Sequence, residues 1–549
     1  MRPILDVAAE LGLGPDDVSL YGRNTAKLTH RTLRRLTDGE PRGRRGKLIL
    51  VTALTPTKYG EGKTTTSVAL AQGLARLGKR ALAALREPSM GPIFGAKGGG
   101  TGGGRATLEP SAQINLHFTG DLHAISAANN LLAALADNAM HFRLEGAPDV
   151  RKVTWRRVLD MNERALRKIV IGLGGSTGGV PREAAFDITA ASEVMAAVCL
   201  ATSFADLKVR LGRLIVGYDS ADRPVTAASL GATGPMAAIL ADAILPNLAQ
   251  TSDGVPALVH GGPFANIAHG CSSVLSSKAA LALADYVVTE AGFAFDLGGE
   301  KFFDIKCRTS GLWPSAVVVV ATVRALRAHG DDPDLHATGA DALAAIERGM
   351  VNLDRHVTAI RRFGFDPVVA INAFDRDSPA ELEALEGFCH ERGLRVARHT
   401  AFANGGEGAT ALAEAVELAT SVPAPAPRFL YPLEATPQEK LYAIATQVYG
   451  ATDVSFEPQA LAEIARAKAI GFENVPICVA KTHLSLSDDP TLGGNPPPFT
   501  LHVREMRIRA GAGFLLALTG EIQTLPALPK KPAAFGIDAT DDGEVVGVR

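Results

Sequence analysis

The chain has 549 residues, of which 46% are hydrophobic and 21% charged, and its net charge at pH 7 is −2. This composition is typical of a globular protein with room for about two to four domains. A net charge so close to zero gives no reason to expect nucleic acid or a membrane surface as a partner. No apolar run approaches the roughly 20 residues of a membrane-spanning helix, and no signal peptide is expected. The five cysteines lack zinc or disulfide spacing, which favours a cytoplasmic location.

The most informative stretch of the chain covers residues 47–77. It begins with an apolar run of strand length, passes through a glycine-containing turn, and continues into residues 64–77, where apolar side chains recur at helical spacing. This order predicts a phosphate-binding loop, in which backbone N–H groups and the helix dipole bind an anion. The match to the usual motif is incomplete, because Thr57 replaces its first glycine. The residues predicted to bind the nucleotide phosphates are Thr57, Lys58, Tyr59, Gly60, Glu61, Gly62, Lys63, Thr64 and Thr65.

Two side chains of this loop carry specific predictions. Lys63 would place a positive charge on the terminal phosphates, and the Thr64 hydroxyl would complete the shell of a Mg²⁺ ion bound with the nucleotide. The alternative is an ordinary strand–helix turn with a surface lysine. The periodicity on both sides of the turn favours the phosphate-binding interpretation.

The elements that follow predict an α/β fold with a mainly parallel sheet. A strand over residues 80–85 completes a strand–helix–strand unit, and ligands of such a unit collect where its strands end. Further buried strands are expected at residues 169–173, 214–217, 257–260, 286–289 and 317–322, with covering helices at 126–144 and 232–248.

After an exposed junction near residue 330, helices are expected at 341–363 and 381–392, and strands at 367–371 and 394–397. A proline-rich connector follows from residue 421. The sequence therefore predicts three domains: a large P-loop domain over residues 1–345, a smaller α/β domain over 346–447, and a C-terminal α/β domain over 448–549.

Two features follow the strand at residues 80–85. Arg86 could bind a phosphate or a carboxylate through two parallel hydrogen bonds, although a surface arginine is the alternative. Its neighbour Glu87 is as suited to orienting Arg86 as to contacting a metal. The glycine-rich residues 91–105, which include Lys97 and Arg105, are predicted to form an active-site loop rather than a flexible linker, because they lie close to Arg86 in the chain.

Two pairs of residues follow later strands. Gly298 and Gly299 could present their amides to a reacting acyl or phosphoryl group. Phe374 and Phe402 could hold a flat heterocycle between them, although core packing is the commoner role of phenylalanine.

Six blocks of sequence, at near-constant spacing along residues 1–549, match one pattern. They include Thr-Pro-Thr-x-x-Gly-Glu-Gly-Lys-Thr-Thr-Thr (55–66), Arg-Glu-Pro-Ser-Met-Gly-Pro (86–92) and His-Gly-Gly-Pro-Phe-Ala-Asn-Ile-Ala-His-Gly-Cys (260–271), with further blocks at 114–125, 320–327 and 404–408. Together these blocks resemble formate–tetrahydrofolate ligase. The resemblance implies an ATP-dependent joining of formate to tetrahydrofolate, giving 10-formyltetrahydrofolate, ADP and phosphate by way of formyl phosphate. It also implies Mg²⁺, a monovalent cation (K⁺ or NH₄⁺) and a homotetramer.

The resemblance assigns roles to individual residues. Lys63 and Thr65 would hold the phosphoryl group, and Arg86 would clamp the formyl phosphate beside Gly298 and Gly299. Asp121 would face the pterin ring of the folate, although capping of the helix that follows is an alternative role. The aromatic folate platform of the family corresponds to Phe374 and Phe402.

The chain departs from the family pattern at three places. Lys58 stands where proline is usual, residues 98–105 read Gly-Gly-Gly-Thr-Gly-Gly-Gly-Arg, and Phe402 stands where tryptophan is usual. The smaller ring should weaken stacking on the pterin by about 1 kcal/mol.

Two alternative functions remain open from the sequence. Lys58, five residues before Lys63, resembles the lysine of deviant-Walker partition ATPases, which are nucleotide switches that bind a protein partner. A switch of this kind would hydrolyse ATP without a small acceptor molecule. A weaker alternative is another P-loop ligase that joins a carboxylate to an unrelated amine.

Overall fold

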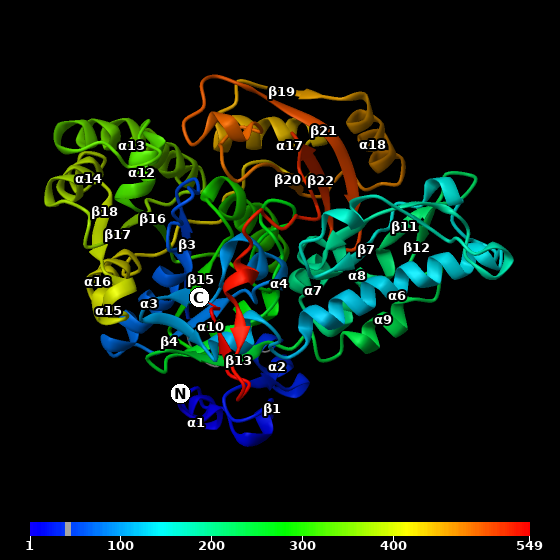
Figure 1. The fold of residues 1–549 in the computed structure, drawn as a ribbon, viewed down its shortest axis with the longest axis horizontal. Helices are drawn as coiled ribbons and strands as arrows, with labels where there is room; N and C mark the ends of the chain where they lie inside the picture. The colour runs from blue at the N-terminus through cyan, green and yellow to red at the C-terminus, as the bar shows by residue number, and fades with distance from the viewer. Residues whose placement is uncertain (39–45, 549) are drawn as a thin grey trace.

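The computed structural model describes residues 1–38 and 46–548, and its centre is a mixed twelve-stranded sheet (Figure 1). The order of its strands is β1-β2-β13-β14-β4-β15-β3-β16-β17-β18, and β6 joins β13 while β5 pairs with β6. The strands are β1 (Val18–Leu20), β2 (Ala26–Leu28), β3 (Lys47–Ala53), β4 (Ala81–Leu85), β5 (Gly102–Gly103), β6 (Ala106–Glu109), β13 (Asn247–Thr251), β14 (Pro256–Val259), β15 (Tyr286–Glu290), β16 (Ala316–Ala321), β17 (Val368–Asn372) and β18 (Arg395–His399).

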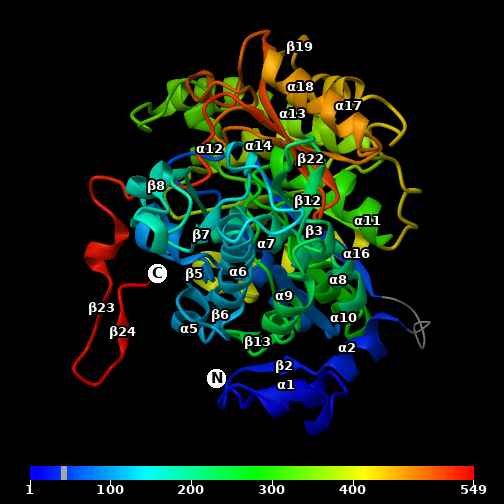
Figure 2. The same cartoon turned by 90° about the vertical axis from the view of Figure 1, so that its right-hand side faces the viewer.

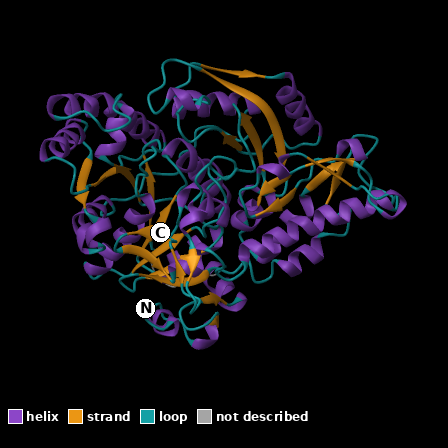
Figure 3. Ribbon diagram, viewed as in Figure 1, coloured by secondary structure: helices purple, strands orange, loops and turns teal. Residues whose placement is uncertain are grey.

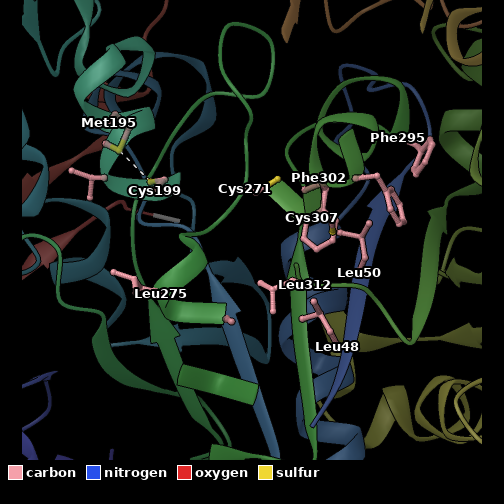
Figure 4. Packing of buried hydrophobic residues seen from close by; sticks show 14 of the residues in the cluster. Leu48, Leu50, Met195, Cys199, Cys271, Leu275, Phe295, Phe302, Cys307 and Leu312 are labelled. Atoms are coloured by element: carbon pink, nitrogen blue, oxygen red, sulfur yellow. Dashed lines mark hydrogen bonds between the residues drawn. The ribbon is translucent and has the colours of Figure 1, made fainter. Parts of the chain in front are cut away.

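The strands from β14 to β18 in this order are all parallel. Strand β3 lies between β15 and β16, and its side chains are buried on both faces, as a covered parallel sheet requires. Leu48 and Leu50 pack into the core on one face, where Figure 4 shows them beside Phe302 and Leu312, whereas Ile49 and Val51 pack into the core on the other face. The mainly parallel α/β sheet predicted from the sequence is therefore confirmed.

Helices cover both faces of this sheet. Helices α3 (Lys63–Arg76) and α16 (Thr410–Ala419) contribute to the core that contains Ile49. Helices α10 (Val274–Leu283), α12 (Val323–His329), α13 (Gly339–Arg362) and α14 (Pro379–Glu391) contribute to the core that contains Leu48. The shorter helices are α1 (Ile4–Glu10), α2 (His30–Thr37), α4 (Met90–Pro92), α5 (Ser111–Asn115), α11 (Arg308–Ser310) and α15 (Ala401–Asn404).

A helical lobe extends to the right of the sheet in Figure 1. It contains α6 (Asp121–His141), α7 (Glu193–Leu200), α8 (Phe204–Arg213) and α9 (Thr233–Ile239). It also carries three small two-stranded sheets, formed by β7 (Arg157–Leu159) with β10 (Phe186–Ile188), β8 (Ile169–Ile171) with β9 (Arg182–Ala184), and β11 (Ile215–Tyr218) with β12 (Pro224–Thr226).

Two predictions of elements in this region were wrong, and a third was correct in part. The strand expected at residues 169–173 is present as β8, but it is half-exposed rather than buried. The strand expected at residues 214–217 is present and mostly buried as β11, although it pairs in a small antiparallel sheet of the lobe and not in the large sheet. The helix expected at residues 232–248 ends at Ile239, and Asn247 begins the buried strand β13. A short apolar run suits a buried helix and a buried strand equally, and Pro246 separates the two elements here.

The C-terminal part forms a second sheet above the first, with the order β19-β21-β22-β20 (Figure 1). Its last residues form a hairpin that stands away from the body of the molecule (Figure 2). Strands β17 and β18 continue the large sheet past residue 345, and the division into three domains stays a prediction. Figure 3 shows the strands of the protein in orange among purple helices. No helix in the described residues is both long and apolar enough to span a membrane. The C-terminal elements are α17 (Pro437–Ile444), β19 (Asp453–Phe456), α18 (Pro458–Ala469), β20 (Ile477–Ala480), β21 (Thr500–Arg509), β22 (Phe514–Thr519), β23 (Asp538–Ala539) and β24 (Val545–Val546).

Candidate active site

The predicted phosphate-binding loop connects the end of β3 to the start of α3. Gly60 and Gly62 both have φ of +72°, which favours glycine, and a Cβ on Gly62 would lie 2.3 Å from Asn372 Nδ2. Helix α3 begins at Lys63, and the N–H groups of its first turn have no partner within the helix. The turn therefore has the geometry of an anion site at a helix N-terminus.

The loop is held together by Thr57 and Glu61. The Thr57 N–H donates to Glu61 Oε1 at 2.7 Å, and the Tyr59 N–H donates to the Thr57 hydroxyl at 3.3 Å. Thr57, which replaces the usual first glycine, thus supplies a hydroxyl that closes the turn. Burial raises the pKa of Glu61, and its second carboxylate oxygen has no hydrogen-bond partner.

Two of the predicted nucleotide-binding side chains, Lys58 and Tyr59, contact residues 333 and 334 of the same chain. Lys58 forms an ion pair with Asp334 and is 58% exposed, and the Tyr59 hydroxyl donates to the Pro333 carbonyl at 2.9 Å. Both side chains are therefore directed toward the loop after α12. The Lys58 ammonium already has an anionic partner in its own chain, which weighs against the role of a nucleotide-switch lysine.

Glu290, the last residue of β15, joins the loop to Arg86. The Thr64 hydroxyl donates to the Glu290 carboxylate, with distances of 3.0 and 3.3 Å to its two oxygens, and Arg86 Nη2 lies 3.8 Å from Glu290 Oε1. This happens because β15 lies between β3 and β4, so the carboxyl ends of the three parallel strands meet at one edge of the sheet. The sequence analysis missed Glu290, although an acidic residue at the end of a buried strand is a signal that could have found it.

Arg86 is positioned with one donor still free. Its Nη1 donates to the Pro263 carbonyl at 3.0 Å, whereas its buried Nε has no hydrogen-bond partner. Only 21% of the side chain is exposed, and leaving a buried donor unpaired costs about 1–3 kcal/mol. A Cβ on Gly292 would lie 3.0 Å from Arg86 Nη1, so the backbone approaches the guanidinium closely. A bound anion would supply the missing acceptor.

Two lysines share the electrostatic environment of Arg86. Burial lowers the pKa of Lys63, with the Glu290 charge opposing this change and the Arg86 charge adding to it. Desolvation by surrounding protein atoms lowers the pKa of Lys97 to about 8, and here the Arg86 and Lys63 charges add to the effect while the Glu290 charge opposes it. Part of the Lys97 side chain remains exposed to solvent. The three cations outnumber the Glu290 and Glu61 carboxylates that face them, and this excess of positive charge suits a phosphate.

The predicted glycine pair lies close to this cluster, but not as a pair of amide donors. The Gly298 N–H donates to the Ala294 carbonyl at 3.1 Å, so the expectation that this amide is free for a ligand was wrong. A Cβ on Gly298 would lie 2.2 Å from the Gly292 carbonyl oxygen, and one on Gly299 would lie 2.3 Å from the Phe295 ring. The two glycines therefore allow tight packing of the segment whose Gly292 touches Arg86.

The two phenylalanines predicted to form a platform do lie together. The ring centroids of Phe374 and Phe402 are 6.4 Å apart with an angle of 46° between the rings, and Phe402 is 52% exposed. The Arg324 guanidinium stacks on the Phe374 ring at 3.8 Å. The exposed faces of this pair could accept a flat heterocycle.

The glycine-rich loop connects this platform to the phosphate-binding loop. A Cβ on Gly103 would lie 3.2 Å from the Phe402 ring and 3.6 Å from the Thr65 hydroxyl. The Arg105 N–H donates to the Phe402 carbonyl at 3.0 Å. The loop is thus packed against Phe402 and Thr65 rather than extended as a linker, and its role in an active site stays a prediction.

Asp121 lies in a different buried contact. Its carboxylate accepts from Lys27 Nζ at 2.7 Å and from Asn247 Nδ2 at 2.8 Å, and the contacts recorded among the described residues join it to neither platform phenylalanine. Gly120, not Asp121, is the capping residue of α6, so the capping alternative was wrong by one residue. Burial and the Asp121 charge raise the pKa of Glu87 well above its usual value.

The site has no dedicated metal cage. No group of three or more His, Cys, Asp or Glu side chains in residues 1–38 and 46–548 could hold a metal ion. The Thr64 hydroxyl and the Glu290 carboxylate are oxygen ligands of the kind that Mg²⁺ takes when most of its shell is phosphate and water. These residues therefore fit an ion that arrives with a nucleotide.

Comparison with known proteins gives one consistent result. A family model described as "Formate--tetrahydrofolate ligase" matches residues 1–549. The formate–tetrahydrofolate ligase of Myxococcus xanthus (strain DK1622) is 54% identical over 551 residues, which cover 100% of this chain and 99% of that protein. The similarity thus includes every element of the site described above.

Proposed function

The chain belongs to the formate–tetrahydrofolate ligase family, and from this premise we propose that it forms 10-formyltetrahydrofolate by way of a formyl phosphate intermediate. The enzyme joins formate to tetrahydrofolate at the expense of ATP. The nucleotide switch is not favoured, because the resemblance to ligases extends over the full chain.

The proposed intermediate follows from the chemistry of the substrates. Formate is a carboxylate, and an amine cannot expel oxide from it. Attack of a formate oxygen on the γ-phosphorus of ATP forms a new P–O bond and breaks the bond to the bridging oxygen, which leaves with ADP. The N10 amine then attacks the formyl carbon, phosphate leaves with the electron pair of the C–O bond, and N10 loses its proton.

The cluster around Glu290 suits the first of these steps. Lys63, Arg86 and Lys97 would neutralise the transferring phosphoryl group, and Glu290 would keep Arg86 and Thr64 in place. The observation that carries the proposal is that Thr64 of the phosphate-binding loop and Arg86 contact the same carboxylate. A single anion could therefore touch both.

The cofactors and assembly are proposed on the family resemblance. Mg²⁺, when bound, neutralises phosphate charge, and Thr64 and Glu290 are the residues suited to hold it. A monovalent cation (K⁺ or NH₄⁺), a homotetramer and a cytoplasmic location remain predictions. Tetrahydrofolate would bind on Phe374 and Phe402. A role for Asp121 at the pterin remains a prediction, because its carboxylate already accepts hydrogen bonds from Lys27 and Asn247.

The test is the rate of ADP formation with each substrate withheld in turn. ADP should form rapidly only when formate and tetrahydrofolate are both present, with equal formation of 10-formyltetrahydrofolate followed by absorbance. Equal ATP turnover with both withheld would instead support the switch. Turnover with formate and a different amine would support a ligase with another acceptor.

A further inference from the structure

The segment between β15 and the helical turn at Phe295–Gly299 adopts an unusual backbone. Gly298 packs against Gly292, which lies beside Arg86, and between the two glycines Phe293 has φ of +58°. A bulky residue rarely adopts this left-handed conformation, and such strain persists only where surrounding contacts impose it. Residues 291–299 are called the Arg86-supporting segment below.

The contacts that impose this conformation come from the C-terminal part of the chain. Lys481 Nζ lies 2.8 Å from Asp296 Oδ2, with the two side chains only 0% and 3% exposed. The His483 ring stacks on the Phe293 ring with centroids 4.4 Å apart and 25° between the planes. Lys481 directly follows the last residue of β20, so the second sheet carries both contacts.

An ion pair this deeply buried needs an explanation other than stability. Removing two charges from water costs free energy that their attraction seldom returns in full, so apolar side chains of similar size would serve stability as well. What a buried pair does supply is a defined geometry, because an unpaired charge in the core is strongly disfavoured. The Lys481 ammonium also donates to the Thr482 and Ser485 carbonyls, and these hydrogen bonds fix the position of the ammonium.

We propose that Lys481 and His483 are positioning residues for the ligase reaction, which hold the Arg86-supporting segment so that Arg86 meets the reacting phosphoryl group. The inference rests on the proposed function, because it takes Arg86 as the group that contacts formyl phosphate. Few contacts separate these two residues from Arg86. Lys481 pairs with Asp296, and His483 stacks on Phe293. Gly292, which precedes Phe293, limits where the Arg86 guanidinium can lie. The second sheet thereby takes part in catalysis without contacting a substrate.

The first experiment separates positioning from stability at the ion pair. Lys481→Met alone should lower both the melting temperature and kcat, since Asp296 is left buried and unpaired. The double variant Lys481→Met/Asp296→Leu should recover the melting temperature while kcat stays about ten- to a hundredfold below wild type. Its KM for ATP should change little, because the phosphate-binding loop is untouched.

Lys440→Met is the matched control. Lys440 is also fully buried in the C-terminal part, but it donates to the Glu473 and Val475 carbonyls and not to the Arg86-supporting segment. Its loss should lower the melting temperature without lowering kcat at a temperature where the variant is folded. A double variant with wild-type kcat would overturn the inference, and so would an equal loss of kcat in Lys440→Met.

The second experiment tests the ring contact and remains informative if the ion-pair variants fail to fold. His483→Ala should lower kcat and raise KM for formate, whereas His483→Phe, which can still stack on Phe293, should restore both. Unchanged kinetics in His483→Ala would contradict the inference. The wild-type enzyme tests the proposed function separately: if it fails to form ADP in response to formate and tetrahydrofolate, that function fails first, and the variants are not needed to show it.

Discussion

At the scale of single residues, the site depends on one carboxylate that keeps several cations together. Glu290 contacts Arg86 and Thr64 and opposes the loss of charge from Lys63 and Lys97. The positive side chains outnumber it, so the empty cluster should be less stable than the cluster with a bound phosphate. This imbalance is the physical basis of the next two predictions.

Arg86→Ala should lower kcat by at least about a hundredfold, or about 2.7 kcal/mol, because a preorganised donor to the phosphoryl group is lost. ATP binding measured by calorimetry should persist, since the phosphate-binding loop is intact. Arg80→Ala is the matched control: Arg80 precedes the same strand β4 at its opposite end, pairs with Asp285 and is 66% exposed. Wild-type turnover in Arg86→Ala would remove Arg86 from the mechanism.

Lys97 should make kcat/KM for ATP depend on pH near 8. Desolvation by its neighbours and the Arg86 charge lower its pKa to about 8, so the side chain is a charged ammonium below that pH and loses its proton as the pH rises through 8. The alkaline fall in kcat/KM should move to higher pH in Lys97→Arg, because a guanidinium stays protonated. An alkaline fall that is identical in Lys97→Arg and wild type would show that another group titrates.

At the scale of elements, the proposed folate platform is built by two strand ends and the glycine-rich loop. Phe374 and Phe402 follow β17 and β18, which are parallel neighbours, and β5 of the loop packs on Phe402. The spacing of the strands along the chain predicts that the phenylalanines follow strands. Their meeting at 6.4 Å depends on β17 and β18 being adjacent in the sheet.

Phe402→Ala should raise KM for tetrahydrofolate about fivefold, which corresponds to about 1 kcal/mol of lost stacking. KM for ATP should not change, and Phe402→Trp should lower KM for tetrahydrofolate. Phe142→Ala is a suitable control, because Phe142 is also exposed but lies at the far end of α6. A selective rise in KM for ATP in Phe402→Ala would place the platform at the nucleotide instead.

At the scale of the whole molecule, the C-terminal part reaches the site from two directions. The second sheet holds the Arg86-supporting segment, and the turn at Ala533–Gly536 lies against the segment that carries Lys97, with Ala533 Cβ 3.9 Å from the position of a Cβ on Gly98. The hairpin of β23 and β24 beyond this turn pairs only with itself among the described strands (Figure 2).

Removal of residues 538–549 should therefore leave kcat and the melting temperature unchanged, because only the protruding hairpin is lost. Removal of residues 530–549 also takes away the turn at Ala533–Gly536, and we expect KM for ATP to rise several-fold as the Lys97 segment loosens. Leu525, which is buried, remains in both truncated chains. Equal KM values for the two truncated chains would show that the turn does not support the site.

The sequence by itself determined the features that depend on neighbouring residues: the glycine turn before Lys63, the strand that ends before Arg86, the long helix near residue 350 and the family. Each is a local pattern of glycine, charge or apolar period. Tertiary structure alone decided that Glu290 joins Thr64 to Arg86, that Asp121 pairs with Lys27, and that Lys481 reaches Asp296. The order of strands in the sheet and the packing of one sheet on another create these contacts between residues far apart in the chain, and no local pattern encodes that order.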